Sequence, residues 1–168
     1  MKEENKMTYS IVYSSRTGNT KILADAIKEV VGEDCIYFGI PDEEALKADY
    51  IYVGFWTDKG CCNSEIKDFL KKIKNKTVFL FGTAGFGEDQ EYFEKIIQRS
   101  EKSLSDDVKV DGHYMCQGKM PLSVKARYEK MLESPVHMPN IKQLIENFDK
   151  ALTHPDLDDV RKLKDMIK

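Results

Sequence analysis

Short apolar runs alternate along this chain with longer segments in which apolar residues recur every three or four positions. The short runs are rich in Val, Ile, Phe and Tyr and predict buried strands at residues 8–13, 35–38, 49–56, 77–81 and 108–116. The longer segments have the spacing of amphipathic helices and cover residues 19–31, 63–73, 89–100, 140–152 and 155–167. A weaker helical pattern covers residues 121–134. Strands that alternate with helices predict an α/β fold, in which helices cover both faces of a parallel sheet.

Two of the predicted strands differ in pattern from the others. Residues 77–81 are the most hydrophobic run, which favours a central position in the sheet. Residues 108–116 alternate apolar with polar side chains, which favours an edge strand with one face in water. We expect a single domain over residues 1–168, with a core over 8–152 and a C-terminal helical extension over 153–168.

Composition and charge exclude several classes of function. A chain of 168 residues, of which 41% are hydrophobic and 33% charged, is typical of one globular domain. A net charge of −3 argues against general nucleic-acid binding, which needs a clustered basic surface. No apolar run approaches the roughly 20 residues of a membrane span, and residues 1–6 lack the apolar part of a secretory signal. The four cysteines and three histidines lack metal-site spacing. We therefore expect a cytoplasmic protein with free thiols, without a metal and without a membrane partner.

The most informative stretch is the polar loop 14–20, which follows the first predicted strand directly and reads Ser-Ser-Arg-Thr-Gly-Asn-Thr. It leads into a predicted helix, and a helix N-terminus offers unpaired N–H groups and a partial positive charge. Short hydroxyl and amide side chains add further donors. A polar turn that only caps the helix is the simpler alternative. The strand–loop–helix context favours a phosphate site instead.

Two more loops would lie beside this one, because ligands of open parallel sheets bind at the carboxyl ends of the strands. Loop 56–64 contains the only tryptophan, Trp56, and loop 82–89 contains three glycines around Phe86. A phosphate loop beside two loops that each carry an aromatic residue predicts a pocket for a phosphate attached to a flat ring.

The segment from Ser15 to Thr20 matches the flavodoxin phosphate loop, Ser/Thr-x-Thr-Gly-x-Thr, and the order of elements extends the match over residues 8–152. The chain thus resembles the flavodoxin family. The resemblance implies a flavodoxin-like, doubly wound five-stranded parallel sheet of order 2-1-3-4-5, which is the order known for flavodoxins, with FMN as the cofactor. A narrower similarity to flavodoxin-domain proteins of anaerobic bacteria implies a partner reductase, of which bilirubin reductase is one case.

The resemblance assigns FMN-binding roles to residues of all three loops. The phosphate would be held by the side chains and N–H groups of the first loop, namely Ser15, Arg16, Thr17, Gly18, Asn19 and Thr20. The indole of Trp56 would cover one face of the isoalloxazine ring. The ring nitrogen N5 would meet the backbone of Thr57, Asp58, Lys59 and Gly60. The pyrimidine side and ribityl chain would be bordered by Thr83, Ala84, Gly85, Phe86 and Gly87.

Several points stay open at this stage. The second aromatic cover of the ring is either Phe86 or Tyr92, because the third loop departs from the usual flavodoxin spelling. The vicinal thiols Cys61 and Cys62 are more often inert than redox-active, and Cys116 is expected to be a buried strand residue. Many flavodoxins are strongly acidic, which disfavours the negatively charged reduced flavin. The net charge of −3 implies that this effect is weak in this chain.

Two functions fit an FMN pocket. The first is an electron carrier that passes electrons to or from a partner redox protein or reductase. In such a carrier we expect a peptide flip near Gly60, since glycine tolerates a positive φ. The alternative is an FMN-dependent NAD(P)H oxidoreductase that acts on a quinone-like or other conjugated small molecule. Such relatives have longer loops after the third strand, so the short connector 57–63 favours the carrier, with a monomer slightly preferred.

Overall fold

The computed structural model describes residues 6–85, 89–136 and 139–167 and has a parallel sheet at its centre. The sheet contains β1 (Tyr9–Tyr13), β2 (Cys35–Gly39), β3 (Tyr50–Asp58), β5 (Thr77–Ala84) and β6 (Lys109–Gln117). The order across the sheet is β2-β1-β3-β5-β6, which confirms the predicted order of the five parallel strands. The edge position predicted for β6 is confirmed. The hydrophobic strand β5 is internal, but the middle of the sheet is β3 rather than β5.

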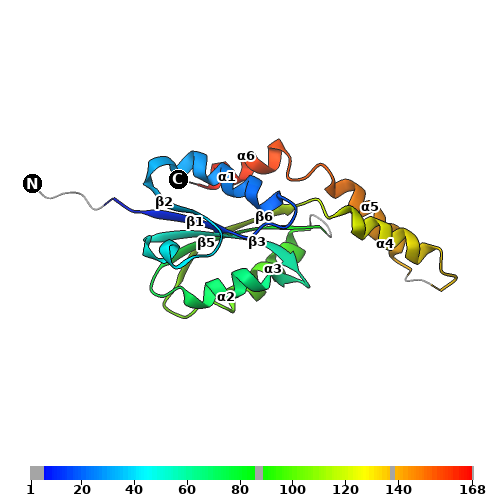
Figure 1. Cartoon of the computed structure of the whole chain (residues 1–168), viewed down its shortest axis with the longest axis horizontal. Helices are drawn as coiled ribbons and strands as arrows, with labels where there is room; N and C mark the ends of the chain where they lie inside the picture. Colours follow the sequence, from blue (N-terminus) through cyan, green and yellow to red (C-terminus); the bar gives the residue numbers. More distant parts are fainter. Residues whose placement is uncertain (1–5, 86–88, 137–138, 168) are drawn as a thin grey trace, which may run out of the picture.

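Helices cover both faces of the sheet (Figure 1). One face carries α1 (Asn19–Val31) and α6 (Leu157–Met166), and the other carries α2 (Ser64–Lys72) and α3 (Gln90–Glu101). Two short 3-10 helices, η1 (Gly32–Asp34) and η2 (Glu43–Lys47), flank β2. The apolar helix positions meet alternate strand residues in two buried clusters, one on each face. This arrangement follows from the two periodicities of the sequence, 3.6 in the helices and 2 in the strands.

Residues at the helix ends explain where the helices start and stop. Helix α1 ends at Gly32, whose φ of 64° is a positive value that glycine adopts without strain. The side chain of Asp89 accepts a hydrogen bond from the N–H of Glu91 at the start of α3. Helix α6 begins with a capping box between Asp156 and Asp159. These residues set where α1 ends and where α3 and α6 begin over the sheet.

The register of β3 against β5 depends on two glycines that face aromatic rings. Gly54 pairs with Phe81, and Phe55 pairs with Gly82. A Cβ on Gly54 would lie 2.3 Å from the Phe81 ring, and one on Gly82 would lie 2.5 Å from the Phe55 ring. Both rings are fully buried. The interlocked pairs fix the two strands so that Trp56 and Thr83 lie side by side at their carboxyl ends.

Helices α4 (Leu122–Leu132) and α5 (Ile141–Ala151) form a hairpin that projects beyond one end of the sheet (Figure 1). Lys125 of α4 pairs with Asp149 of α5 at 2.7 Å. The chain then returns, and α6 packs against α1 with Leu163 fully buried in the cluster of that face. The segment that leaves the sheet is therefore the α4–α5 hairpin, whereas α6, which was expected in a C-terminal extension, lies in a core layer.

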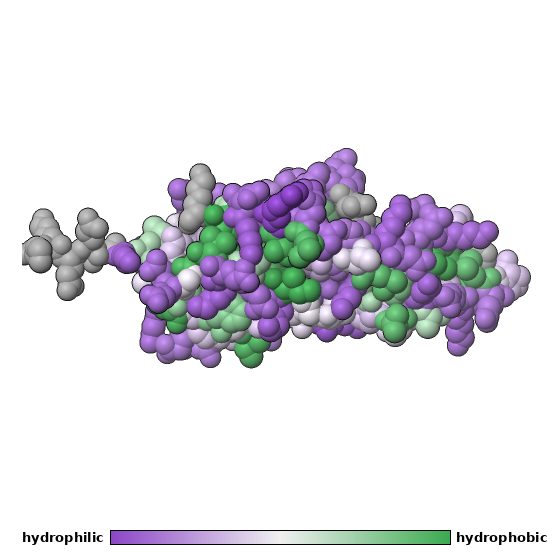
Figure 2. Space-filling model, turned by 90° about the horizontal axis from the view of Figure 1, so that it is seen from above, coloured by the Kyte–Doolittle hydropathy of each residue, from purple (hydrophilic) through white to green (hydrophobic). Residues whose placement is uncertain are grey.

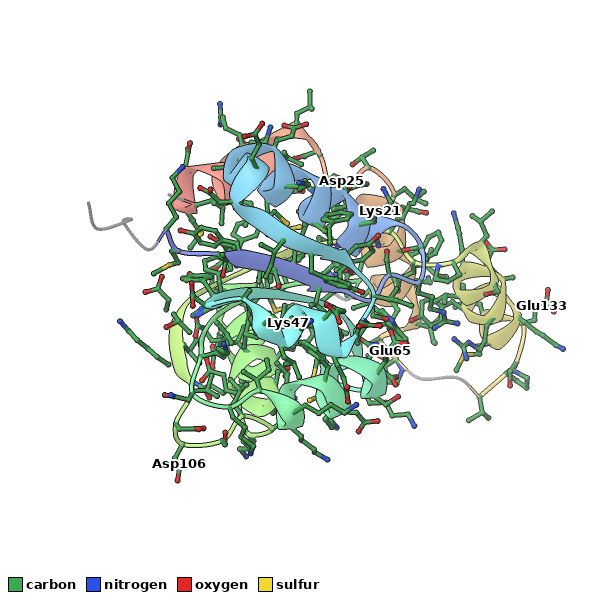
Figure 3. The ribbon with its side chains drawn as sticks, turned by 60° about the vertical axis from the view of Figure 1, so that its left-hand side comes forward. Lys21, Asp25, Lys47, Glu65, Asp106 and Glu133 are labelled. Carbon is green, nitrogen blue, oxygen red and sulfur yellow. The ribbon has the colours of Figure 1, made fainter. Side chains whose placement is uncertain are left out.

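The outer surface carries the charged residues of the helices. Lys21 and Asp25 form an ion pair at 2.9 Å on the side of α1 that faces away from the sheet (Figure 3). The face covered by α1 and α6 is mostly hydrophilic, with apolar areas among the polar ones (Figure 2). In the described ranges, no helix has the length and hydropathy needed to cross a membrane.

Candidate cofactor site

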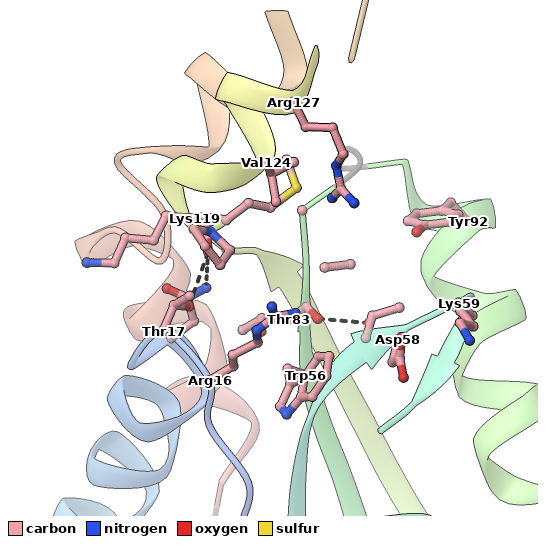
Figure 4. Close-up of a pocket in the computed structure, with 18 of the residues that line it drawn as sticks. Arg16, Thr17, Trp56, Asp58, Lys59, Thr83, Tyr92, Lys119, Val124 and Arg127 are labelled. Carbon is pink, nitrogen blue, oxygen red and sulfur yellow. Dashed lines mark hydrogen bonds between the residues drawn. The ribbon is translucent and has the colours of Figure 1, made fainter. Parts of the chain in front are cut away.

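A pocket of about 280 Å³ lies at the carboxyl ends of β3 and β5, beside the loop that follows β1 (Figure 4). All three predicted loops contribute to it, namely through Arg16, Thr17, Asn19, Trp56, Thr57, Asp58, Lys59, Gly60, Thr83, Ala84 and Gly85. Tyr92, one of the two candidates for the second aromatic cover, lines it as well. The sequence did not predict the remaining side, which is formed by Gly118, Lys119, Met120, Pro121, Val124, Arg127 and Tyr128. The structure therefore brings the three loops together and adds a fourth segment after β6.

The loop between β1 and α1 leads directly into the N-terminus of a helix. Gly18 is the N-cap of α1 with φ 89°, so the loop turns sharply into the helix. The hydroxyl of Ser15 accepts a hydrogen bond from the N–H of Lys21 at 3.4 Å. The hydroxyl of Thr20 is buried and donates its one hydrogen to the carbonyl of Phe55 at 3.1 Å, so a phosphate could accept from it only if this bond were exchanged. Ser15, Gly18 and Thr20 thus shape the loop without lining the pocket, whereas Arg16, Thr17 and Asn19 do line it.

The turn after β6 lies directly against this loop, through the backbone of Lys119. The carbonyl of Lys119 accepts hydrogen bonds from Thr17 Oγ1 at 3.2 Å and from Asn19 Nδ2 at 2.7 Å (Figure 4). A Cβ on Gly118 would lie 2.6 Å from Asn19 Nδ2, so only glycine permits this approach. The other amide atom, Asn19 Oδ1, is buried and has no hydrogen-bond partner among the residues that the structure describes. Such an orphaned acceptor is costly and indicates a donor that arrives with a ligand or water.

Trp56 lies near the end of β3, with its half-buried indole in the pocket. The guanidinium carbon of Arg16 is 5.4 Å from the centre of the ring, which is cation–π geometry. The backbone of Trp56 is held by Asn63, whose Oδ1 accepts from the Trp56 N–H at 3.3 Å. The position fits an aromatic cover for a flat ligand.

The segment after Trp56 is a β-hairpin rather than the plain loop that the sequence predicted. β4 (Cys61–Cys62) pairs antiparallel with Thr57 and Asp58. Lys59 and Gly60 form the two-residue turn with φ values of 53° and 79°, as a type I′ turn requires. Arg99 of α3 donates to the Gly60 carbonyl at 3.1 Å. Gly60 is therefore held from outside the pocket, and the turn presents Asp58 and Lys59 at its mouth.

The third predicted loop starts where β5 ends. Thr57 Oγ1 donates to the Thr83 carbonyl at 2.8 Å, which ties this loop to the hairpin. Gly85 lies so close to Met120 that a Cβ at this glycine would be 2.4 Å from the Met120 side chain. Phe86 and Gly87, to which the resemblance also gave roles, lie outside the described residues.

Two tyrosines also supply aromatic side chains to the pocket lining. Tyr92 of α3 lines the pocket (Figure 4), and Tyr128 of α4 does so as well. Burial raises the pKa of Tyr92 and of Tyr128, so both hydroxyls stay neutral at physiological pH. Of the two candidates for a second aromatic cover, Tyr92 is the one that the described structure brings to the pocket. Tyr128 was not expected from sequence.

The remaining reactive groups lie away from the pocket. Burial raises the pKa of the Cys62 thiol to about 11 and that of Cys116 well above its usual value. Both thiols therefore stay protonated and unreactive at neutral pH. His154, Asp156 and Asp159 form a cluster within 4.8 Å, the one group with metal-ligand chemistry found in the described part of the chain. The hydrogen bonds that cap α6 account for this cluster.

The architecture and the loop geometry match a known family. A family model described as a flavodoxin domain matches residues 10–168. The chain belongs to this family. A flavodoxin-like domain-containing protein BilS from Clostridium symbiosum (strain WAL-14163) is 45% identical over 169 residues, which covers 89% of this chain and 88% of that protein. A BilS protein from Clostridioides difficile (strain CD3) is 34% identical over 154 residues, covering 87% of this chain and 86% of that one. The solution structure of two-electron reduced Megasphaera elsdenii flavodoxin has a TM-score of 0.50 and 25% identity, and covers 86% of this chain and 100% of that chain.

The cofactor of flavodoxin domains is FMN, and the groups in the pocket fit it. The N-terminus of α1 and the neutral donors of its loop suit the phosphate. Asn19 Oδ1 has no donor within the described ranges, and the ribityl hydroxyls of FMN could supply one. The indole of Trp56 suits the ring. This flavodoxin domain therefore has a place for each part of FMN.

Proposed function

We propose that this chain is an FMN flavoprotein that passes electrons to or from a partner redox enzyme. The observation that carries the proposal is the arrangement of one pocket, with a helix-terminal polar loop on one side and Trp56 on another. The membership in the flavodoxin family supports the redox role. When bound, FMN supplies one-electron and two-electron redox chemistry.

The phosphate end of the cofactor is assigned to the first loop. The N–H groups of residues 16–20 and the hydroxyls of Ser15, Thr17 and Thr20 are its proposed donors. Thr17 Oγ1 and Asn19 Nδ2 now donate to the carbonyl of Lys119, so a phosphate would compete with this carbonyl as their acceptor. Arg16 adds a positive charge on the same side, over Trp56.

The ring end is assigned to Trp56, to the backbone of residues 57–60 and to residues 83–87. The turn at Lys59 and Gly60 supports a role in positioning the ring. Lys59 is a non-glycine residue with φ 53°, a conformation that costs on the order of 1 kcal/mol. A flip of the peptide between Lys59 and Gly60 would reorient a carbonyl at the mouth of the pocket.

A partner reductase suits a small domain whose cofactor lies at the carboxyl edge of its sheet, where another protein can reach it. The relatives from anaerobic bacteria support such a partner, of which a bilirubin reductase is one candidate. We place the activity in the cytoplasm, because all four cysteines are free, as is usual in a reducing compartment. We propose a single domain that acts as a monomer.

The proposal is tested by purifying the protein and following its flavin. We expect a yellow protein that releases FMN on denaturation. Thr17→Val should weaken FMN binding but not riboflavin binding, because riboflavin lacks the phosphate. Thr77→Val, at the start of β5 and far from the pocket, is the matched control and should change neither.

Stepwise reduction then separates the two candidate functions. A stable one-electron-reduced flavin supports the carrier, whereas fast turnover with NAD(P)H alone indicates the oxidoreductase. A colourless protein that takes up no added FMN contradicts both.

A further inference from the structure

One side of the pocket is formed by helix α4, which lies outside the three loops that hold FMN in the proposed function. Val124, Arg127 and Tyr128 of α4 line the pocket. Their spacing of three and four positions places them on one side of the helix, and we call these residues the α4 face. Met120, just before the helix, packs on Gly85. The α4 face is therefore part of the cofactor site rather than a surface feature beside it.

The α4–α5 hairpin holds this face in place. Gln117 Nε2, at the end of β6, contacts the carbonyl of Asn147 in α5 at 3.4 Å. Lys125 pairs with Asp149 at 2.7 Å, and its ammonium lies 5.8 Å from the centre of the Phe148 ring. Phe148 is fully buried. Because α5 anchors α4, Arg127 is presented to the pocket by a packed helix.

The charges around the pocket are unbalanced, although the chain as a whole is acidic. The lining includes one carboxylate, Asp58, and four cations, Arg16, Lys59, Lys119 and Arg127. Within the ranges that the structure describes, none of these four cations forms an ion pair. Uncompensated positive charge in a pocket favours a ligand that carries, or acquires, negative charge.

The four cations do not point in the same direction. The side chain of Lys119 extends away from the pocket, whereas the guanidinium of Arg127 points down into it from α4 (Figure 4). Arg16 reaches in from the phosphate loop and lies over Trp56. The phosphate side thus has its own cation in Arg16, and Arg127 enters from a different side, together with the α4 face.

We propose that Arg127 supplies positive charge to the ring end of the FMN site and makes the protein bind reduced FMN more tightly than oxidised FMN. This inference rests on the proposed FMN function. Each one-electron reduction adds a negative charge unless a proton enters with the electron, and in flavins that charge resides on the pyrimidine part of the ring. A guanidinium stabilises it by its charge and by its fixed fork of N–H donors. Preference for the reduced cofactor raises the reduction potential, the opposite of the effect of acidic surroundings.

Arg127→Gln is the decisive variant, because it removes the charge and keeps a polar side chain of similar reach. Arg127→Lys keeps the charge without the fork. Lys130→Gln makes the same charge change at an exposed position of α4 outside the pocket lining and is the matched control. The Kd values of each protein for oxidised FMN and for riboflavin are measured by fluorescence quenching, and the reduction potentials of the holoproteins by equilibration with reference dyes.

We expect Arg127→Gln to change the Kd for oxidised FMN less than about twofold. The preference for reduced FMN should fall about tenfold, which is a potential lowered by about 59 mV for a one-electron couple. Arg127→Lys should retain most of the preference, and Lys130→Gln all of it.

Three results would overturn the inference. The first is an unchanged potential in Arg127→Gln. The second is an equal shift in Lys130→Gln, which would reduce the effect to long-range charge. The third is weaker binding of oxidised FMN with riboflavin binding spared, which would assign Arg127 to the phosphate. A wild-type protein that does not bind FMN contradicts the proposed function itself, so the two failures are distinct.

Discussion

Two buried asparagines beside the pocket differ in one respect, and this difference predicts opposite effects of the same substitution. Asn19 and Asn63 are 6% and 3% exposed. Asn63 satisfies both amide atoms, since its Oδ1 accepts from the Trp56 N–H and its Nδ2 donates to Ser14 Oγ at 3.0 Å. In the described part of the chain, Asn19 satisfies only Nδ2 and leaves Oδ1 without a partner. Replacement by alanine in the FMN-free protein therefore removes a cost at one site and a benefit at the other.

The expected sizes follow from these bonds. Asn19→Ala loses one hydrogen bond of about 1 kcal/mol, but it also removes a buried orphan oxygen that costs about 1–3 kcal/mol. The Lys119 carbonyl keeps Thr17 as a donor. We expect Asn19→Ala to stabilise the FMN-free protein by up to about 2 kcal/mol. Asn63→Ala loses two hydrogen bonds and leaves the Trp56 N–H unpaired, which should destabilise it by about 3 kcal/mol.

Urea denaturation of the FMN-free proteins measures both free energies of unfolding. With FMN present, the effect of Asn19→Ala should become unfavourable, because the Asn19 amide is proposed to contact the cofactor. We expect the Kd for FMN to rise about tenfold in Asn19→Ala, or about 1.4 kcal/mol. If Asn19→Ala destabilises the FMN-free protein as much as Asn63→Ala does, Oδ1 is not an unsatisfied acceptor and the reasoning is refuted.

Two further substitutions test the ring site and the packing of the C-terminal helix. Trp56→Ala should weaken FMN binding about 10- to 100-fold and restore flavin fluorescence, since a stacked base on an aromatic side chain contributes about 1–3 kcal/mol. Trp56→Phe should retain most of the binding. Unchanged quenching of flavin fluorescence in the alanine variant would rule out stacking. Leu163→Ala, in a fully buried position of α6, should lower the free energy of unfolding by about 2–5 kcal/mol. Leu152→Ala, at a side chain that is 43% exposed, should cost less than about 1 kcal/mol. If urea denaturation showed equal losses of unfolding free energy for the two leucine variants, α6 would not belong to the core layer.

Much of the fold could be predicted because each element has its own period and its own stop signal. The buried face of α1 follows from the spacing of Leu23 and Ile27, and its end follows from Gly32. The strand order could not come from periodicity, which says nothing about which strands are neighbours. It came from the resemblance carried by the phosphate loop. The sequence predicts a loop over residues 56–64 because they lack an apolar run, whereas the structure has a two-residue turn at Lys59-Gly60 between two short extended segments.

The site was predictable only as far as it is local in sequence. Each of the three loops directly follows a strand, so the topology places them together once the sheet is parallel. The contribution of α4 depends on a crossing of the chain from β6 toward the first loop, and nothing local to residues 118–128 signals it. Gly118 was the one hint, since its lack of a Cβ allows contact with Asn19. Arg127 looked like any charged residue on a weakly amphipathic helix.

The backbone of Lys119 connects parts of the chain that are made at different times. Its carbonyl accepts from side chains 102 and 100 positions earlier, and its N–H donates to the carbonyl of His154 at 3.1 Å. During translation at about 5–20 residues per second, roughly 100 residues take on the order of 5–20 s. For that interval Thr17 and Asn19 are already synthesised but lack their acceptor, and the pocket lacks one of its sides. Completion of the cofactor site is thus a late event in the synthesis of the chain, even though its most recognisable motif is among the first residues to be made.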